Sequence, residues 1–174
     1  MIKLMIADVE PWVREGLFHA VEWNKMEIEV VGCASNGQEA YDLYIENKPR
    51  IIITDIKMPF IDGLELTKKI LDMDSDAYIL LISAYSDFDY AKRALELGAM
   101  DYILKPFSKK KILSIIEKAV NTIYSNDEKK QLVEKSREYI KQYVIDKITG
   151  TLYTEYADIK KLFEENSLTI YNRD

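Results

Sequence analysis

The sequence has one cysteine, Cys33, among its 174 residues. A single cysteine cannot close an intramolecular disulfide, so nothing in the chain calls for an oxidising compartment. Glycine and proline are also scarce, with 6 and 4 residues. These low counts exclude collagen-like and low-complexity chains. With 48% hydrophobic residues, the sequence is instead typical of a globular protein that buries a sizeable core.

The chain also lacks a long apolar run and an excess of positive charge. Apolar stretches such as 78–82 are far shorter than the roughly 18 residues that a membrane span needs. Acidic residues number 30 against 24 basic ones, which gives a formal net charge of −6. This balance opposes binding of a polyanion over the whole surface. We therefore expect a cytoplasmic protein whose residues here contact neither a membrane nor a nucleic acid.

Short apolar segments alternate with longer segments of helical period. Five strands are expected at residues 2–7, 28–34, 50–54, 78–82 and 100–104. Helices are expected at about 11–23, 37–47, 63–74, 87–97 and 108–124. Several of the strands are apolar without alternation, as is typical of parallel strands covered by helices on both faces. The pattern predicts an α/β fold over residues 1–124, with a doubly wound five-stranded parallel sheet.

Residues 125–174 follow a different pattern. Ser125 and Glu128 have capping-box spacing for a new helix, whose apolar stripe runs to Ile148 and for which Gly150 suits the end. A shorter amphipathic helix is expected at about 155–166. We interpret this segment as a helical linker. Its stripe can pack on the preceding domain, pair with a second copy as a short coiled coil, or lead to a further domain.

Charged and polar side chains stand at the ends of four expected strands. They are Asp8 and Glu10, Asp55, Ser83 and Lys105. The ligand site of a doubly wound sheet lies at the carboxyl ends of its strands, so we expect these side chains to converge. Acids held together repel one another unless they share a cation, and Mg²⁺ takes one or two carboxylates with water and phosphate. The sequence therefore predicts a Mg²⁺ and phosphoryl site at this edge.

Three separated motifs resemble the receiver domain of two-component response regulators. They are Thr54-Asp55-Ile56-Lys57-Met58-Pro59 with Asp62-Gly63, Leu81-Ile82-Ser83-Ala84-Tyr85, and Asp101-Tyr102-Ile103-Leu104-Lys105-Pro106-Phe107. The resemblance covers about residues 2–123 and implies the flavodoxin-like fold of that family. It also implies a signalling protein, not an enzyme, that receives a phosphoryl group from a sensor histidine kinase.

The resemblance gives individual residues their roles. Asp55 is the implied phosphoacceptor, and Lys105 is implied to contact the phosphoryl group. Ser83 is the implied switch hydroxyl and Tyr102 the implied aromatic switch. The bond between Lys105 and Pro106 is expected to be the cis peptide of the family.

One position departs from the receiver pattern. The family carries an acidic pair before the first helix, and here Asp8 aligns with the first acid and Val9 with the second. In the family the second acid binds the metal directly. The implied Mg²⁺ ligands are therefore Asp55, the backbone carbonyl of Lys57 and, through water, Asp8. We expect weak Mg²⁺ binding and slow or conditional phosphorylation, with Glu10 as a poorly placed substitute.

Further segments resemble the subgroup of regulators with an AraC-type helix-turn-helix output domain. They are Glu15-Gly16-Leu17, Glu22-Trp23, Glu29-Val30-Val31-Gly32, Asn36-Gly37, Thr54-Asp55-Ile56 and Ser83-Ala84-Tyr85-Ser86-Asp87-Phe88-Asp89-Tyr90-Ala91. This resemblance implies control of transcription by an output domain beyond Asp174 that binds DNA. The alternative is a stand-alone or degenerate receiver that acts by protein contacts. A homodimer is expected through the face of the fourth helix, fifth strand and fifth helix, or through the helix at 125–149.

Overall fold

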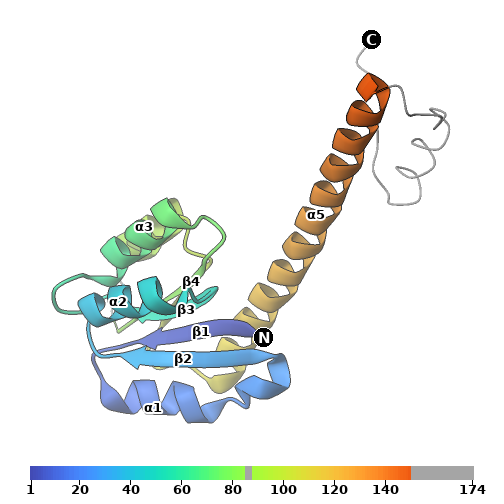
Figure 1. The fold of residues 1–174 in the computed structure, drawn as a ribbon. Coiled ribbons are helices and arrows are strands. Elements are labelled where there is room, and N and C mark those ends of the chain that lie inside the picture. The colour runs from blue at the N-terminus through green and yellow to red at the C-terminus, as the bar shows by residue number, and fades with distance from the viewer. Residues whose placement is uncertain (85–87, 150–174) are drawn as a thin grey trace. The chain divides into compact units, whose positions relative to one another are not determined.

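The computed structural model describes residues 1–84 and 88–149, in which strands and helices alternate (Figure 1). The strands are β1 Ile2–Ala7, β2 Ile28–Ala34, β3 Ile51–Asp55, β4 Tyr78–Ser83 and β5 Asp101–Leu104. The helices are α1 Pro11–Ala20, α2 Gly37–Asn47, α3 Gly63–Met73, α4 Phe88–Glu96 and α5 Lys109–Thr149, with a short 3-10 turn, η1, at Trp23–Met26. The strands form one parallel sheet in the order β2-β1-β3-β4-β5, which confirms the doubly wound fold.

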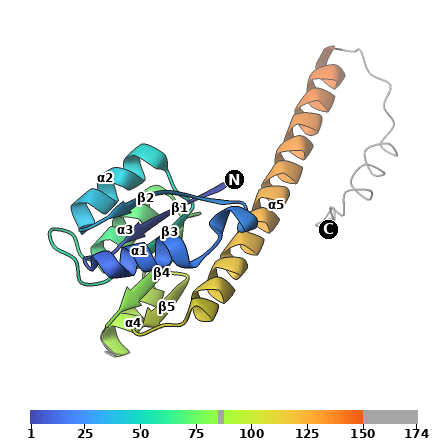
Figure 2. The same ribbon diagram turned by 90° about the horizontal axis from the view of Figure 1, so that it is seen from below.

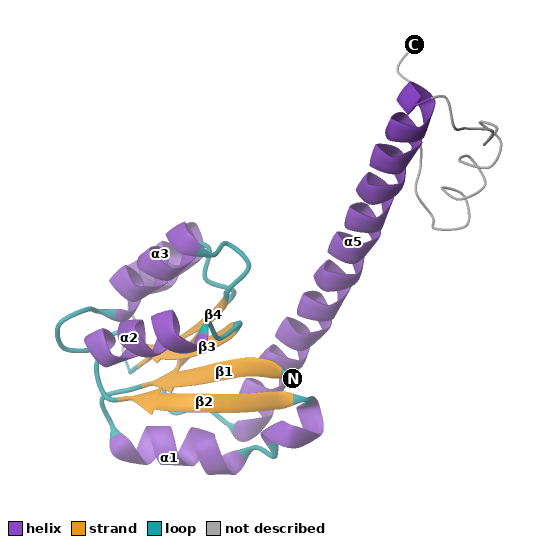
Figure 3. Ribbon diagram, viewed as in Figure 1, coloured by secondary structure: helices purple, strands orange, loops and turns teal. Residues whose placement is uncertain are grey.

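Helices cover both faces of the sheet, with α2 and α3 on one face and α1 on the other (Figure 3). On the first face, Ile52 and Leu81 of the strands pack in one cluster with Tyr44 of α2 and Ile70 of α3. Because successive strand residues point to opposite faces, Ile53 faces the side of α1. Every residue of β3 is buried, as expected for a central strand without apolar and polar alternation. Viewed from the side of α1, β4 and β5 lie with α4 at one edge of the sheet (Figure 2).

The first helix ends earlier than its apolar pattern predicts. It stops at Ala20, and the expected continuation to Trp23 is wrong because Trp23 begins η1. The indole Nε1 of Trp23 donates a hydrogen bond to the carbonyl oxygen of Leu17 at 3.2 Å. This bond satisfies one of the carbonyl groups that the end of a helix leaves without a partner. Trp23 is thereby buried without extending the helix.

Helix α5 differs most from the sequence prediction. It begins at Lys109, where the Ser108 hydroxyl accepts the Lys111 N–H at 3.2 Å, and it runs without interruption to Thr149. The helix end expected at 124 and the new start at Ser125 are therefore wrong. The sequence between Lys109 and Thr149 contains neither glycine nor proline, the residues that most strongly stop a helix.

The chain divides into two units, Met1–Asn121 and Thr122–Asp174. The assignment of residues 125–174 as a linker stays a prediction. Gly150 and the helix expected at 155–166 lie outside the described residues. Within the described part of the chain, no helix has both the length and the apolar character needed to cross a membrane.

Candidate functional site

Parallel pairing brings the carboxyl ends of four strands to one edge of the sheet. Ala7 of β1 is paired with Thr54 of β3, so both strands end at the same level. Ser83 of β4 is paired with Leu104 of β5 in the same way. This register places at one edge the predicted site residues that end or follow these strands, namely Asp8, Asp55, Ser83 and Lys105.

The ammonium group of Lys105 lies among three carboxylates. Its Nζ is 2.8 Å from Asp8 Oδ2, 2.8 Å from Glu10 Oε2 and 3.8 Å from Asp55 Oδ2. Asp8 and Asp55 are 1% and 8% exposed, so water screens little of their charge. Three acids and one lysine leave the cluster with an excess of negative charge. The predicted convergence of Asp8, Asp55 and Lys105 is confirmed.

These surroundings shift the pKa values of two groups. Burial, with the negative charge of Asp8, raises the pKa of the Asp55 carboxyl from 3.8 to about 6, while Lys105 opposes the change. For Lys105, burial lowers the pKa, but hydrogen bonds to Asp8 and Glu10 outweigh it and leave the pKa above its ordinary value. The Asp55 carboxyl thus has a pKa close to neutral pH and lies beside a charged lysine, a combination typical of functional sites.

The loop between β1 and α1 is held by its own polar groups. Asp8 Oδ1 accepts the backbone N–H of Glu10 at 2.9 Å. The Arg14 guanidinium donates to the carbonyl oxygens of Asp8 and Val9, at 2.6 and 3.1 Å. The side chain of Val9 is left exposed, whereas the carboxylate of Glu10 reaches Lys105.

Asp55 is oriented by the turn that follows β3. Its Oδ1 accepts the backbone N–H of Ile56 at 2.9 Å. Gly63, the first residue of α3, donates its N–H to the Ile56 carbonyl at 2.8 Å. A Cβ at Gly63 would collide with the backbone carbonyl of Asp55. The glycine of the Asp62-Gly63 motif therefore lets α3 begin against the end of β3, while Asp62 caps that helix by accepting the N–H of Glu65.

The other predicted residues lie around this centre. Ser83 ends β4, is buried, and accepts the backbone N–H of Lys105 through its carbonyl oxygen at 2.7 Å. Tyr102 lies on β5, partly buried against the core cluster. Lys57 is exposed, with its ammonium 5.9 Å from the centre of the Tyr90 ring. The cis peptide bond between Lys105 and Pro106 is confirmed. The switch roles and the Lys57 carbonyl ligand stay predictions.

The buried acids suit Mg²⁺ in number and kind. No group of three or more Asp, Glu, His or Cys among the described residues is arranged to hold an ion by itself. Mg²⁺, however, takes one or two carboxylates and completes its shell with water and phosphate oxygens. Asp8 and Asp55 offer two carboxylates in a cluster with excess negative charge, and Val9 adds no donor.

The position of the Glu10 carboxylate is not predicted by the sequence. The expectation that Glu10 is a poorly placed substitute ligand stays a prediction. The structure shows that its Oε2 lies 2.8 Å from Lys105 Nζ, a contact that the sequence does not indicate. Pro11 was the available signal. Proline favours the first position of a helix, so it indicates that α1 starts directly after Glu10 and that Glu10 belongs to the short loop that follows Asp8.

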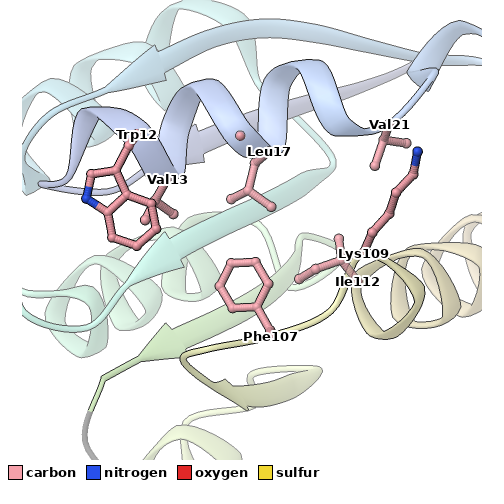
Figure 4. A pocket seen from close by; sticks show the side chains of 8 residues that line it. Trp12, Val13, Leu17, Val21, Phe107, Lys109 and Ile112 are labelled. Carbon is pink, nitrogen blue, oxygen red and sulfur yellow. The ribbon is translucent and has the colours of Figure 1, made fainter.

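An apolar hollow beside the acidic cluster was also not predicted. It has a volume of about 220 Å³ and lies between α1 and the start of α5 (Figure 4). Its lining is mainly apolar: Trp12, Val13, Leu17, Val21, Phe107 and Ile112, with Lys109 at its side. An adjoining hollow shares Trp12 and Phe107 and extends to Glu10 and Lys105. Trp12 is 66% exposed, although it is the largest apolar side chain of the lining.

Comparison with known proteins agrees with this geometry. Residues 4–117 match the response regulator receiver domain family. The chain is 32% identical over 158 residues to the uncharacterized transcriptional regulatory protein YesN of Bacillus subtilis. That alignment covers 91% of this chain but only 42% of YesN. The chain thus spans less than half the length of this relative.

Two solved structures resemble the fold closely. The REC domain of AraT, a response regulator from Geobacillus stearothermophilus, is 31% identical with a TM-score of 0.69, covering 72% of this chain and 98% of that one. A two component transcriptional regulator AraC from Clostridium phytofermentans is 28% identical with a TM-score of 0.67, covering 73% and 98%. With its parallel sheet, its strand-end acids and lysine, and its match over residues 4–117, this chain belongs to the response regulator receiver domain family.

Proposed function

We propose that this chain is the phosphorylation-dependent receiver of a two-component system. It accepts a phosphoryl group on Asp55 from a sensor histidine kinase and thereby controls a transcriptional output. The observation that carries the proposal is the buried pair of Asp8 and Asp55 with Lys105 within 3.8 Å of both. Membership of the receiver family supports the same role.

The proposed reaction is a nucleophilic attack by the Asp55 carboxylate. Its Oδ2 faces Lys105, while Oδ1 is engaged by the Ile56 N–H. A bond forms between Asp55 Oδ2 and the phosphorus of a phosphohistidine. The P–N bond breaks, and its electron pair stays on the imidazole nitrogen. With a pKa of about 6, Asp55 is ionised at neutral pH and needs no separate base. Lys105 stabilises the charge that develops on the phosphoryl oxygens.

Mg²⁺ belongs to this proposal as a cofactor. When bound, it supplies further neutralisation of the phosphoryl oxygens. Asp8 and Asp55 would hold it, together with the backbone carbonyl of Lys57. The Asp8 carboxylate is kept in place for this purpose by the Glu10 N–H that its Oδ1 accepts, and the Asp8 backbone by the Arg14 guanidinium. Since the side chain of Val9 supplies no oxygen, we expect the affinity for Mg²⁺ to be weak.

Phosphorylation would alter the protein through Ser83 and Tyr102. The mixed anhydride on Asp55 adds negative charge and acceptor oxygens at the edge where Ser83 ends β4. The Ser83 hydroxyl turns to donate a hydrogen bond to it, and the Tyr102 side chain moves into the vacated space. The conformational equilibrium of the face formed by α4, β5 and the start of α5 then shifts toward the active conformation.

The transcriptional output lies outside the receiver itself. The name of YesN supports a transcriptional output, and that of the Clostridium neighbour supports an AraC-type regulator. We infer from the sequence resemblance that the output is a helix-turn-helix domain that binds DNA. In this proposal residues 1–124 are the receiver and 125–174 the linker to that domain, and the protein works in the cytoplasm. A homodimer would form through the α4–β5–α5 face or through exposed apolar side chains of α5 such as Val133 and Ile140.

The apolar hollow supports docking of the kinase close to Lys105. Its Trp12 and Phe107 also line the adjoining hollow that reaches Lys105. An amphipathic helix of the kinase could insert apolar side chains there and present its phosphohistidine to Asp55. Large exposed aromatic residues in such positions commonly carry much of the binding energy of an interface.

A second candidate function has one observation in its favour. Val9 replaces an acid that receivers use to bind the metal, and its side chain is exposed. A degenerate receiver would keep the fold and act by protein contacts with little or no phosphorylation. The phosphorylation experiment below separates the two functions.

Incubation with acetyl phosphate and Mg²⁺ tests the proposed function. The intact mass of the wild-type chain is expected to increase by one phosphoryl group, because Asp55 is ionised and lies beside Lys105. Asp55→Asn should remain unlabelled. Asp42→Asn, at an exposed position of α2, is the matched control and should label normally. Wild type that stays unlabelled at every Mg²⁺ concentration would favour the degenerate receiver.

Substitution of Val9 by aspartate tests the account of the metal site. Val9→Asp adds a carboxylate next to Asp8 and should raise Mg²⁺ affinity roughly tenfold or more, and phosphorylation with it. Calorimetric titration with MgCl₂ measures the first effect and intact mass the second. Val9→Leu, which adds no donor, should bind Mg²⁺ as the wild type does. Equal affinity of wild type and Val9→Asp would show that this account is wrong.

Substitution of Trp12 tests the proposed kinase contact. Trp12→Ala should slow phosphotransfer from a histidine kinase that labels the wild-type chain, by roughly tenfold or more. Labelling by acetyl phosphate should be unchanged because this small donor needs no docking surface. Phe18→Ala, also exposed on α1 but outside the hollow, is the control. An equal loss with both phosphodonors would assign Trp12 to the fold, not to docking.

A further inference from the structure

Glu10 is the one acid of the cluster that the proposed phosphotransfer does not use. The Lys105 ammonium lies 2.8 Å from Glu10 Oε2 and 2.8 Å from Asp8 Oδ2, but 3.8 Å from Asp55 Oδ2. The longer distance is beyond hydrogen-bond range. The ammonium therefore forms close ion pairs with Asp8 and Glu10 and makes no hydrogen bond to Asp55, the proposed nucleophile.

The backbone fixes Glu10 in this position. Its N–H is bonded to Asp8 Oδ1, and Pro11 begins α1 directly behind it. Arg14 holds the carbonyl oxygens of Asp8 and Val9 from one turn farther along the helix. These contacts fix the backbone of Glu10, and the Glu10 side chain extends from there to Lys105.

The two ion pairs of Lys105 differ in the cost of breaking them. The side chain of Asp8 is 1% exposed, and separating it from the lysine would leave a buried charge without its partner, which is expensive. The side chain of Glu10 is 44% exposed and becomes hydrated as soon as the pair opens. Partly exposed pairs of this kind contribute little net energy. Lys105 can therefore leave Glu10 while it keeps Asp8.

We propose that Glu10 is a positioning residue that holds Lys105 away from Asp55 until a phosphoryl group displaces it. The inference rests on the proposed phosphorylation of Asp55. In the unphosphorylated chain, Glu10 binds the ammonium that the incoming phosphoryl oxygens require. It also adds a negative charge that repels an anionic phosphodonor. Glu10 thus restrains phosphorylation, and its exposed ion pair is the contact that opens when the reaction proceeds.

Removal of the Glu10 charge should speed the reaction. Glu10→Gln keeps the length of the side chain but removes its charge, so the ion pair with Lys105 is lost. Labelling by acetyl phosphate at fixed Mg²⁺ is expected to be about two- to fivefold faster than in the wild type, in line with the strength of a partly exposed pair. The difference should shrink at high salt, which screens the pair and the repulsion. Glu15→Gln removes the same charge from an exposed position of α1 and should leave the rate unchanged.

The NMR signal of the Lys105 ammonium reports the contact without any phosphodonor. Glu10→Gln should shift this signal and speed exchange of its protons with water, whereas Glu15→Gln should leave both unchanged. A signal that does not respond to Glu10→Gln would overturn the proposal, because no contact would then exist to release.

The remaining outcomes are also decisive. A labelled wild type with an equal rate in Glu10→Gln refutes the restraint but leaves the proposed function intact. A slower rate that added Mg²⁺ restores would overturn the proposal and assign Glu10 to cation binding. If none of the three chains is labelled, the proposed function itself fails, and the restraint fails with it.

Discussion

The site depends on one lysine shared by three carboxylates. Lys105 contacts Asp8 and Glu10 at 2.8 Å and approaches Asp55 at 3.8 Å. Without this ammonium, Asp8 and Asp55 would be two like charges in a nearly dry edge of the sheet, which is costly. In the proposed reaction the same arrangement matters for Asp55, because Lys105 at 3.8 Å neutralises its carboxylate only in part and leaves it available as the nucleophile. Stability and proposed chemistry therefore rest on a single balance of charge.

The fold serves to hold that balance in place. Parallel strands in register end together, so residues distant in sequence meet at one edge without a dedicated structure of their own. Local devices refine the positions: Arg14 fixes the loop after β1, and Gly63 lets α3 begin against Asp55. The charged site lies at the strand ends, whereas the proposed surfaces for partner proteins lie on exposed helices. Residues that bind a partner can therefore change without a change in the phosphorylation site.

The sequence predicts the sheet, its order of elements and the meeting of Asp8, Asp55 and Lys105, because apolar strands and strand-end charges follow fixed rules. It does not predict that Trp23 ends the first helix with a hydrogen bond, or that α5 continues through Ser125. A capping pattern marks where a helix can start, but it does not stop one that is already formed. The reach of the Glu10 carboxylate depends on a loop geometry that no periodic pattern encodes.

The most direct test of this account is an NMR titration of the Asp55 carboxyl in the metal-free chain. We expect a pKa of about 6 for Asp55, raised from 3.8 by burial and by the charge of Asp8. Between these two values the folded chain binds more protons than the unfolded one, so Asp55 should lower the stability as pH rises through this range. A titration near 3.8 would contradict the claim that burial, together with the neighbouring carboxylates, outweighs the effect of the one shared lysine on the pKa of Asp55.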